Sequence, residues 1–567
     1  MLDKPYDRRH FLQNAAMFST GLVTSLTHAR FASARSRKHG MAQYDYIVIG
    51  AGSAGSVVAN RLTEDPNTRV LLLEAGDPDT KPEIQIPSAW PTLLGSEVDW
   101  AYFTEGEPHL NNRKIFSSRG KVLGGSSSIN GMIYIRGNER DYNSWQALGN
   151  QGWSYPDVLP YFKKSENQQR GASLFHGVDG LLGITDPLSP SLLSQRFVEA
   201  AIAQGYEQNP DFNGEQQSGA GLYQVTVKDG KRQSTAVAFL RPIKDRPNLT
   251  IQTGALVTRL LFEGKRTVGV AYVQNGTEYQ VRVNSEVILS AGAFDSPKLL
   301  MLSGIGPADH LQALGIPVVV DLPGVGQNLQ DHPLAVVGYQ STQNQPLAPS
   351  SNGGEAGLFL HTNNNLDAAP NLQFTFVPLL FVNPAFAREG PGFTITYYVT
   401  HPESRGSVRL RSSSPFDPPL IRVNYLQNQS DMQLMVEGLK ISRQLAQSDV
   451  FNEFRGEEIA PRAEGKSDKA IRDYIRQTCD TAWHPVGTCK MGIDQMAVVD
   501  PQLKVRGIEG LRVVDASIMP TITTGNTNAP AIMIGEKAAD LIKVGCIDSF
   551  YDRNKKHQCT HDFLGSL

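Results

Sequence analysis

A glycine-rich turn between two short apolar runs constrains the fold of this chain more than any other feature. In the segment 44–76, YDYIVIGAGSAGSVVANRLTEDPNTRVLLLEAG, the residues Gly50, Gly52 and Gly55 have the spacing Gly-x-Gly-x-x-Gly. A β-branched run precedes them, a stretch of helical periodicity follows, and a second apolar run ends on Glu74. Strand, glycines, helix, strand and acid in this order predict a Rossmann-type dinucleotide-binding unit.

Each part of this unit has a physical role in holding a dinucleotide. The first glycine permits a tight turn, the second lets the backbone approach a pyrophosphate, and the third lets the helix pack closely on the strand. Free N–H groups at the helix N-terminus, at Ser53 and Ala54, favour phosphate there, and Glu74 can accept hydrogen bonds from ribose hydroxyls. A carboxylate on the ribose argues against NADP but leaves FAD and NAD open.

Length and charge exclude several other classes. With 567 residues the chain is long enough for two domains or one large composite domain. Its 53 basic and 56 acidic residues give a net charge of -3, which predicts no binding to nucleic acid. The 4 cysteines are too few for a disulfide framework. No stretch beyond the first 34 residues is long and apolar enough to predict a membrane helix, and the oligomeric state is left open.

The first 34 residues have the features of an export signal. Arg8 and Arg9 are followed by a moderately apolar run at 15–26 and by the small-residue sequence Ala32–Ala34. Paired arginines, a short weak apolar run and a small-x-small site are typical of a twin-arginine signal. We therefore expect a periplasmic protein. A cytoplasmic protein with a basic leader is the alternative, and cleavage after Ala34 is left open.

A second glycine loop lies in SSRGKVLGGSSSINGMIYIRG, at 117–137, and leads straight into an apolar segment. The part GKVLGGSSSIN resembles the first signature of the glucose–methanol–choline (GMC) flavoprotein oxidoreductases, and GAFDSPKLLMLSGIGP, at 292–307, resembles the second. LPGVGQNLQDHP, HPESRGSVRL, WHPVGTCKMG and VVDASIMPTITTGNTNAPAIMIGEKAADLI resemble further family segments, in the family order. Within the family, the chain looks most similar to bacterial choline and aliphatic alcohol dehydrogenases.

The resemblance implies FAD as the cofactor. In some relatives a histidine directly before the signature asparagine is bonded covalently to the flavin, whereas Ile129 occupies that position here, so we expect non-covalent FAD. Beyond the first glycine unit, the resemblance places further residues at the cofactor: Val122, Gly124, Gly125, Ser126, Asn130, Gly131, Met132, Ile133, Val257, Trp483, Asp515 and Ala516.

The scattered motifs imply an α/β protein, α+β overall. A Rossmann-type FAD-binding domain would be assembled from discontinuous segments, with an inserted substrate domain. The segment 351–425, rich in aromatic and β-branched residues with turn residues between them, predicts an antiparallel sheet in that inserted domain. The expected boundaries are 44–160, 230–335 and 483–545 for the FAD-binding domain, 161–229 and 336–482 for the substrate domain, and 546–567 for a polar tail.

His484 and Asn528 are the predicted catalytic pair. Oxidation of an alcohol by a flavin needs a base for the hydroxyl proton, and histidine has the most suitable pKa. In the family, the histidine of the matching WHPVG is that base, and a histidine or asparagine at the position of Asn528 completes the pair. Glu355 is similar in context to a glutamate that faces the trimethylammonium group in choline-active relatives, which makes choline a possible substrate.

The stretch CDTAWHPVGTC offers a metal-binding alternative for His484. Cys479 and Cys489 flank the histidine with the spacing of the last three ligands of a zinc knuckle. A structural zinc site needs four ligands, and the position of the fourth is Arg476. The terminal His557–His561 has ligand residue types but lies in a polar segment, so no metal is expected at either place.

We therefore expect an FAD-dependent dehydrogenase or oxidase that converts an alcohol to its aldehyde or ketone, with a primary alcohol as the favoured substrate. Hydride would pass to flavin N5, and the electron acceptor would be a quinone, a dye or O2. The resemblance also admits a lyase or a light-driven fatty-acid decarboxylase, although the decarboxylases lack the catalytic histidine. A flavin-binding protein without turnover is the third alternative, and the pair His484 and Asn528 argues against it.

Overall fold

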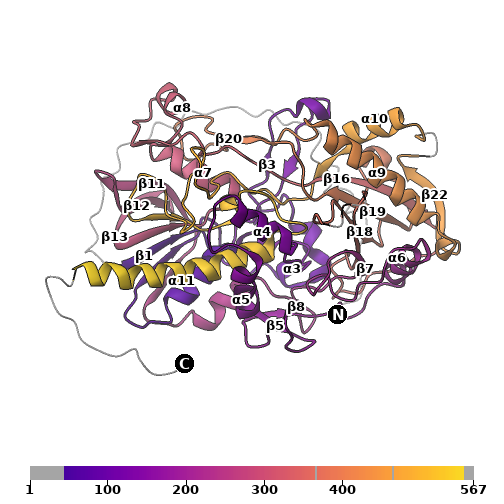
Figure 1. Ribbon diagram of the computed structural model, residues 1–567, viewed down its shortest axis with the longest axis horizontal. Coiled ribbons are helices and arrows are strands. Elements are labelled where there is room, and N and C mark those ends of the chain that lie inside the picture. The colour runs from indigo at the N-terminus through magenta and orange to yellow at the C-terminus, as the bar shows by residue number, and fades with distance from the viewer. Residues whose placement is uncertain (1–43, 364, 366, 463–464, 554–567) are drawn as a thin grey trace.

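The structure, a computed structural model, describes residues 44–363, 365, 367–462 and 465–553. The expected export signal at 1–34 and the histidines of the terminal segment lie outside the described residues. Two sheets dominate the molecule, one towards the left and one towards the right of Figure 1. Between them, loops from distant parts of the sequence converge.

The first sheet is parallel at its centre and antiparallel along one edge. Its order is β10-β2-β1-β13-β12-β11, with β24 beside the end of β13. Ile47 lies opposite Leu71 on one side and Val287 on the other, so buried apolar residues meet across the centre. The bounds are β1 Tyr44–Ile49, β2 Val70–Leu73, β10 Leu249–Gln252, β11 Ala255–Glu263, β12 Arg266–Gln274, β13 Thr277–Leu289 and β24 Leu511–Val513. The parallel centre thus gathers strands from widely separated segments.

Two helices form successive layers over strands β1 and β2 of this sheet. The long helix α11 (Asn528–Arg553) packs on α2 (Ser53–Leu62), and its N-terminal end points towards the middle of the molecule. Gly535 permits this close packing, because a Cβ there would lie 2.7 Å from the carbonyl oxygen of Ala54. The packing aligns the two helices whose N-termini open into the site described below.

The second sheet is antiparallel, in the order β22-β16-β19-β18-β17-β7, with β23 beside β16. All eight residues of β19, GFTITYYV, are buried, because the strand pairs on both sides with β16 and β18 and helix α9 packs on it. The bounds are β7 Gly219–Leu222, β16 Pro333–Ser341, β17 Ala356–Leu360, β18 Leu372–Val377, β19 Gly392–Val399, β22 Arg455–Ala460 and β23 Asp480–Thr481. The covering helices are α6 Leu192–Ala203, α9 Gln429–Ala446 and α10 Asp468–Thr478.

Short elements connect the two halves. The remaining α-helices are α3 Pro82–Gln85, α4 Glu139–Ala147, α5 Tyr155–Ser165, α7 Gly292–Leu302 and α8 Ala308–Ala313. The remaining strands pair as β3 Tyr102–Phe103 with β4 Phe116–Ser117, β5 Glu166–Gln168 with β6 Leu182–Ile184, β8 Val227–Lys228 with β9 Lys231–Arg232, β14 Ile305–Gly306 with β15 Val320–Asp321, and β20 Ser407–Arg409 with β21 Leu420–Arg422.

The overall class agrees with the expectation from the sequence: a mixed α/β protein with a parallel nucleotide-type sheet and a separate antiparallel sheet. Two elements extend across predicted boundaries. Helix α11 continues to Arg553, past position 546, where the predicted polar segment begins. Strand β16 begins at Pro333, slightly before the predicted limit at 335, because its pairing with β19 extends to Leu334.

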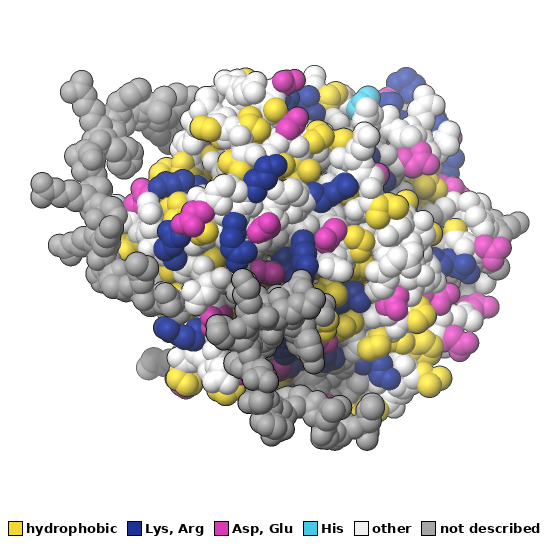
Figure 2. Space-filling model, turned by 60° about the vertical axis from the view of Figure 1, so that its left-hand side comes forward, with side chains coloured by type: hydrophobic (Ala, Val, Ile, Leu, Met, Phe, Trp, Pro, Cys, Tyr) yellow, Lys and Arg dark blue, Asp and Glu magenta, His cyan; other side chains and the backbone are white. Residues whose placement is uncertain are grey.

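The surface carries both signs of charge. In Figure 2 the Lys and Arg side chains are interspersed with Asp and Glu on the face that is shown. No helix within the described part of the chain is both long and apolar enough to cross a bilayer.

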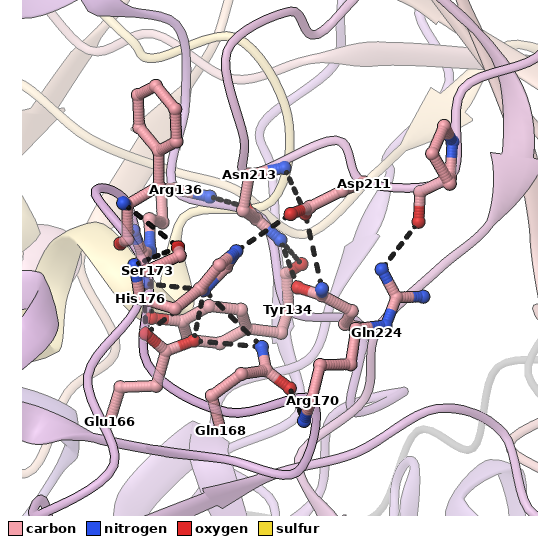
Figure 3. Close-up of polar contacts among 12 residues, drawn as sticks. Tyr134, Arg136, Glu166, Gln168, Arg170, Ser173, His176, Asp211, Asn213 and Gln224 are labelled. Carbon is pink, nitrogen blue, oxygen red and sulfur yellow. Dashed lines mark hydrogen bonds and ion pairs between the residues drawn. The ribbon is translucent and has the colours of Figure 1, made fainter.

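A buried polar cluster, here called the His176 cluster, joins the chain after the second glycine loop to the segment 166–224 (Figure 3). Arg136 and Glu166 form a salt bridge with exposures of 1% and 0%, and His176 lies 3.0 Å from Glu166 and 2.7 Å from Asp211. Its members are Tyr134, Arg136, Glu166, Gln168, Ser173, His176, Asp211, Asn213 and Gln224. The cluster fixes the segment that leaves the glycine loop.

Candidate active site

A cavity of about 380 Å³ extends from the first glycine turn to the second sheet. At one end it is lined by Gly52 and Glu74 of the parallel sheet, and at the other by Thr375 and Val377 of β18 and Thr396 of β19. Both sheets therefore contribute to one cavity, at the carboxyl ends of the parallel strands, where nucleotide-binding folds place their ligands.

The three glycines of the first turn meet three different surroundings. A Cβ at Gly50, where φ is +95°, would lie 2.4 Å from the carbonyl oxygen of Ser290, and a Cβ at Gly55 would lie 2.0 Å from that of Gly50. A Cβ at Gly52 would meet no atom within 4 Å and would point into the cavity lining. Packing explains the first and third glycines, whereas only a ligand close to the backbone explains the second.

The second glycine loop packs against the first, backbone to backbone. The N–H of Gly124 donates to the carbonyl of Ala51 at 2.8 Å, and a Cβ at Gly125 would lie 2.7 Å from the Cα of Gly52. Both Gly124 and Gly125 have positive φ, which favours glycine. Together the two loops form a cradle, lined by Gly52, Ser53 and Ser126, that lets the backbone approach a pyrophosphate.

Glu74 closes the cradle at the end of β2. Its carboxylate accepts from the N–H of Ala51 and from the N–H of Gly76, both at 2.8 Å. Burial, with a smaller contribution from Asp295, raises the pKa of Glu74 to about 7. The carboxylate is held in one orientation at the position where a ribose would lie in a Rossmann unit.

His484 lies at the opposite end, on a rigid turn. Trp483 has φ +61°, Pro485 follows, and the N–H of Trp483 donates to the hydroxyl of Thr481 at 2.7 Å. The side chain of His484 is 8% exposed and lines the cavity. Its backbone N–H donates to Asp331 Oδ1 at 2.8 Å, so the turn is anchored by a buried carboxylate.

Both ring nitrogens of His484 have partners. Nδ1 lies 3.0 Å from Nδ1 of His332, and Nε2 lies 3.1 Å from Nδ2 of Asn526. The Oδ1 of Asn526 accepts from Gln373 Nε2 at 3.4 Å, which turns the Asn526 amide nitrogen towards the ring. Burial, with the nearby Arg119 guanidinium, lowers the pKa of His484 to about 3. The imidazole is neutral at physiological pH and can accept a proton.

Asn528 lies at the first residue of α11 and lines the same cavity. Its Oδ1 accepts from the hydroxyl of Ser53 at 2.7 Å, which joins the N-termini of α11 and α2. The sequence pairs His484 with Asn528, whereas the amide that contacts the ring here is that of Asn526. The stretch TGNTNAP places two asparagines around one turn, and spacing alone does not distinguish them.

Comparisons with known proteins agree with this geometry. Two family profiles, both described as GMC oxidoreductase, match residues 44–334 and 402–535. The chain belongs to the GMC oxidoreductase family. An oxygen-dependent choline dehydrogenase of Pseudomonas savastanoi pv. phaseolicola is 45% identical over 532 residues, which cover 88% of this chain and 94% of that protein.

Two solved structures are also similar to this GMC oxidoreductase. Pyridoxine 4-oxidase from Mesorbium loti has a TM-score of 0.84 and 35% identity, covering 88% of this chain and 99% of the other. A formate oxidase variant from Aspergillus oryzae RIB40, studied for FAD modification, has a TM-score of 0.84 and 29% identity, covering 90% and 100%. The chain is thus an FAD-dependent enzyme of the alcohol dehydrogenase and oxidase class, and the cradle fits its cofactor.

Most residues expected at the FAD of this GMC oxidoreductase converge on the cavity. Gly55, Val122 and Gly124 lie behind the lining and support it. Ile129 lines the cavity where some relatives carry the flavin-linked histidine. The predicted residues in the lining are Gly50, Gly52, Ser53, Ala54, Glu74, Gly125, Ser126, Asn130, Gly131, Met132, Ile133, Val257, Trp483, Asp515 and Ala516.

Glu355, the residue considered for choline recognition, lies outside the lining of this cavity. It is fully buried, and its carboxylate accepts from the N–H of Ser191 at 2.7 Å and from the hydroxyls of Ser194 at 3.0 Å and Ser351 at 2.5 Å. Because Ser191 is the N-cap of α6, the carboxylate stabilises that helix terminus.

The two cysteines that flank His484 in sequence are buried free thiols in different places. Cys479 packs in the core of the second sheet, and Cys489 packs in that of the first. Among the described residues, no group of three or more His, Cys, Asp or Glu side chains has a metal-binding arrangement. The contacts of His484 are with an imidazole and an amide.

Four functional positions were missed from the sequence. Arg119, His332 and Asn526 surround the base, and the signal that could have indicated them is that each lies inside a motif segment of the sequence. The fourth, Arg232, is completely buried and donates from Nη1 to the carbonyl and side-chain oxygens of Asn130, at 2.7 and 2.8 Å. Burial lowers the pKa of Arg232 to about 9. It holds the loop that leads into the cavity.

Proposed function

We propose that this GMC oxidoreductase oxidises an uncharged primary alcohol to its aldehyde, with His484 as the base. The observation that carries the proposal is the position of the neutral His484 side chain, which lines the cavity and has Nε2 3.1 Å from the amide nitrogen of Asn526. When bound, FAD supplies the acceptor for the hydride that leaves the carbinol carbon. Nε2 accepts the hydroxyl proton, and the amides of Asn526 and Asn528 orient the oxygen.

The lining near the second sheet favours an uncharged substrate. It is largely apolar, with Leu334, Leu347, Val377, Leu379 and Phe381. Aliphatic side chains of this kind give no compensation for the desolvation of a cation. The Arg119 guanidinium, which donates to the carbonyl of Trp483 at 2.6 Å, adds a positive charge beside the base.

The acidic side chains in the described lining gather at the dinucleotide end. They are Glu74, Asp295 and Asp515. Burial is the main cause of the raised pKa of each, and Asp295 adds to that of Glu74 while Asp515 adds to that of Asp295, so the three lie near one another. A trimethylammonium group at the other end would have no carboxylate to face.

Choline is the second candidate, because the curated relative at 45% identity is a choline dehydrogenase and because Trp90 and Trp483 could surround a quaternary ammonium. Choline and 3,3-dimethylbutan-1-ol have nearly the same shape and differ in charge, so they form a matched pair. Under anaerobic conditions we expect 3,3-dimethylbutan-1-ol to reduce the flavin at least about tenfold faster, measured by loss of flavin absorbance. Faster reduction by choline would contradict an uncharged substrate.

Further measurements in the same experiment test the reaction class, the electron acceptor and the mode of FAD binding. Decarboxylation of a fatty acid under light without reduction by any alcohol would replace the proposal with the lyase-type alternative. The electron acceptor follows from reoxidation: O2 as acceptor yields hydrogen peroxide, whereas a quinone or dye as acceptor does not. FAD released from denatured protein would support non-covalent binding.

A further inference from the structure

His332 makes the second contact of the catalytic ring and comes from the start of the second sheet, directly before β16. It is completely buried, and its ring stacks on Tyr398 with centroids 5.3 Å apart. The carboxylate of Asp331 accepts from the backbone N–H of His332 at 2.9 Å and from that of His484 at 2.8 Å. One carboxylate thereby fixes the two histidine backbones relative to each other.

The hydrogen-bond partners determine the tautomer of each ring in turn. His332 Nε2 lies 2.8 Å from the carbonyl oxygen of Thr400, and a carbonyl only accepts, so Nε2 carries the proton. Neutral His332 then has a lone pair on Nδ1. His484 Nδ1, 3.0 Å away, must donate to it. Neutral His484 therefore has its lone pair on Nε2, the atom beside the Asn526 amide.

We propose that His332 is a positioning residue that holds His484 in the Nδ1–H tautomer, so that the unprotonated Nε2 faces the substrate. The inference rests on the proposed function, because it concerns the base of that reaction. The chain of contacts starts at a backbone carbonyl, which has no alternative protonation state, and it ends at the reacting nitrogen. In the other tautomer, Nε2 would carry a proton and could not accept one from an alcohol.

The surroundings keep both rings neutral before the reaction. Burial lowers the pKa of His332 well below its usual value, with His484 and His401 adding to the effect. The other charged or titratable groups nearby are Arg119, Asp331, Tyr398 and Tyr425. Tyr425 and Thr481 donate to Asp331 at 2.6 Å each, so this carboxylate is occupied by hydroxyls and backbone N–H groups rather than by an imidazole.

The same contact also serves after proton transfer. When Nε2 of His484 accepts the hydroxyl proton, the ring becomes a cation with protons on both nitrogens. Its Nδ1–H still donates to the lone pair of His332 Nδ1, now as a charge-assisted hydrogen bond, which is stronger. The contact between His332 and His484 therefore keeps its geometry in both states.

Two substitutions of His332 separate its two contacts. In His332→Asn, the side-chain oxygen occupies the place of Nδ1 and can accept from His484, but the donor to Thr400 is lost. In His332→Gln, the amide nitrogen occupies the place of Nε2 and can donate to Thr400, but a methylene group replaces the acceptor for His484. Both variants are neutral amides, so they are matched for polarity.

The tautomer is measured directly by ¹⁵N NMR of the holoenzyme labelled with [¹⁵N]histidine, with His484 assigned by its loss in His484→Gln. We expect an unprotonated Nε2 in wild type and in His332→Asn, and a mixture of tautomers in His332→Gln. Anaerobic flavin reduction by an alcohol should be at least about tenfold slower in His332→Gln than in His332→Asn, at equal FAD content.

An unchanged His484 tautomer in His332→Gln, or equal reduction rates in the two variants, would overturn the proposal. A wild-type enzyme whose flavin is not reduced by any alcohol would instead refute the proposed function. The NMR signals of His484 do not depend on turnover, so the two failures are distinguishable.

Discussion

His176 and His484 are both buried in polar clusters, with exposures of 5% and 8%, yet their ring nitrogens meet different partners. Those of His176 face the carboxylates of Glu166 and Asp211 (Figure 3). Burial acts to lower the pKa of His176, but the hydrogen bonds with the two carboxylates outweigh it and raise the pKa. The ring nitrogens of His484 face an imidazole and an amide, and its pKa falls to about 3.

A carboxylate is present near both rings, so proximity alone does not explain the difference. Asp331 bonds the backbone N–H of His484 and two hydroxyls, whereas Glu166 and Asp211 bond ring nitrogens directly. Direct contact favours the imidazolium, whereas a carboxylate that bonds the backbone fixes geometry without favouring protonation of the ring. One cluster is thereby built to hold charge and strengthen the fold, and the other is built to keep a base neutral.

The largest expected effect comes from removing a charge from the His176 cluster. Arg136→Met leaves the completely buried Glu166 without its guanidinium partner. We expect the free energy of unfolding to fall by about 3–5 kcal/mol, measured by denaturant unfolding of the holoenzyme at fixed FAD. Arg282→Met is the control, because its pair with Glu263 is exposed at 52% and 64% and should change stability by less than about 1 kcal/mol. Equal effects would contradict a structural role for the cluster.

Loss of His484 should affect the rate of flavin reduction rather than the stability of the fold. His484→Gln retains a side chain of similar size and keeps a polar contact for Asn526, but it has no basic nitrogen. We expect FAD to remain bound and flavin reduction by alcohol to slow at least about 100-fold. Stopped-flow absorbance measures the rate, and the bound flavin content checks folding. Near-normal reduction would exclude His484 as the base.

The sequence was most informative where function depends on the backbone. The Gly-x-Gly-x-x-Gly turn, the order of its strands and the signature loops predicted residues that mostly line one cavity, because only glycine tolerates approaches such as that of Gly50 to Ser290. The antiparallel sheet of the substrate half was also indicated by its aromatic and β-branched strands. Both the glycine loops and the strands of this sheet depend on residues that are close together in the sequence.

The surroundings of the base were much less predictable. His332 lies 152 positions before His484 in the chain, and Asn526 and Asn528 differ only in their places around one turn. Glu355 has a residue type suited to a cation but stabilises a helix terminus instead. Each of these roles depends on which side chains meet after folding, and neither spacing nor residue type in a single sequence determines that.

A smaller, pH-dependent effect is expected for His176→Gln. Because the pKa of His176 is raised in the fold, its contribution to stability is fully present below about pH 6.5 and is lost as pH rises through the folded-state pKa. We expect the variant to be less stable than wild type by about 1–3 kcal/mol at pH 6, with the difference narrowing at alkaline pH. Thermal unfolding midpoints of both proteins across this range measure it. A difference that does not change with pH would contradict a protonated His176.

The smallest effect comes from making the surroundings of His484 resemble those of His176. Asn526→Asp replaces the amide 3.1 Å from Nε2 with a carboxylate of the same shape, and it should raise the pKa of His484 by direct contact with the ring. In the wild type the pKa of His484 is about 3, so the base stays unprotonated between pH 8 and pH 5. The rate of flavin reduction should therefore not change with the protonation of His484 over this range. Flavin reduction by the variant should be about tenfold slower at pH 6 than at pH 8, because a protonated Nε2 accepts no proton.

Asn528→Asp is the control. It introduces the same charge two residues further along the chain, where the side chain bonds Ser53, so its rate of flavin reduction should not change with pH. If the rates of the two variants depended on pH in the same way, direct contact with the ring would not explain the difference in pKa between His484 and His176.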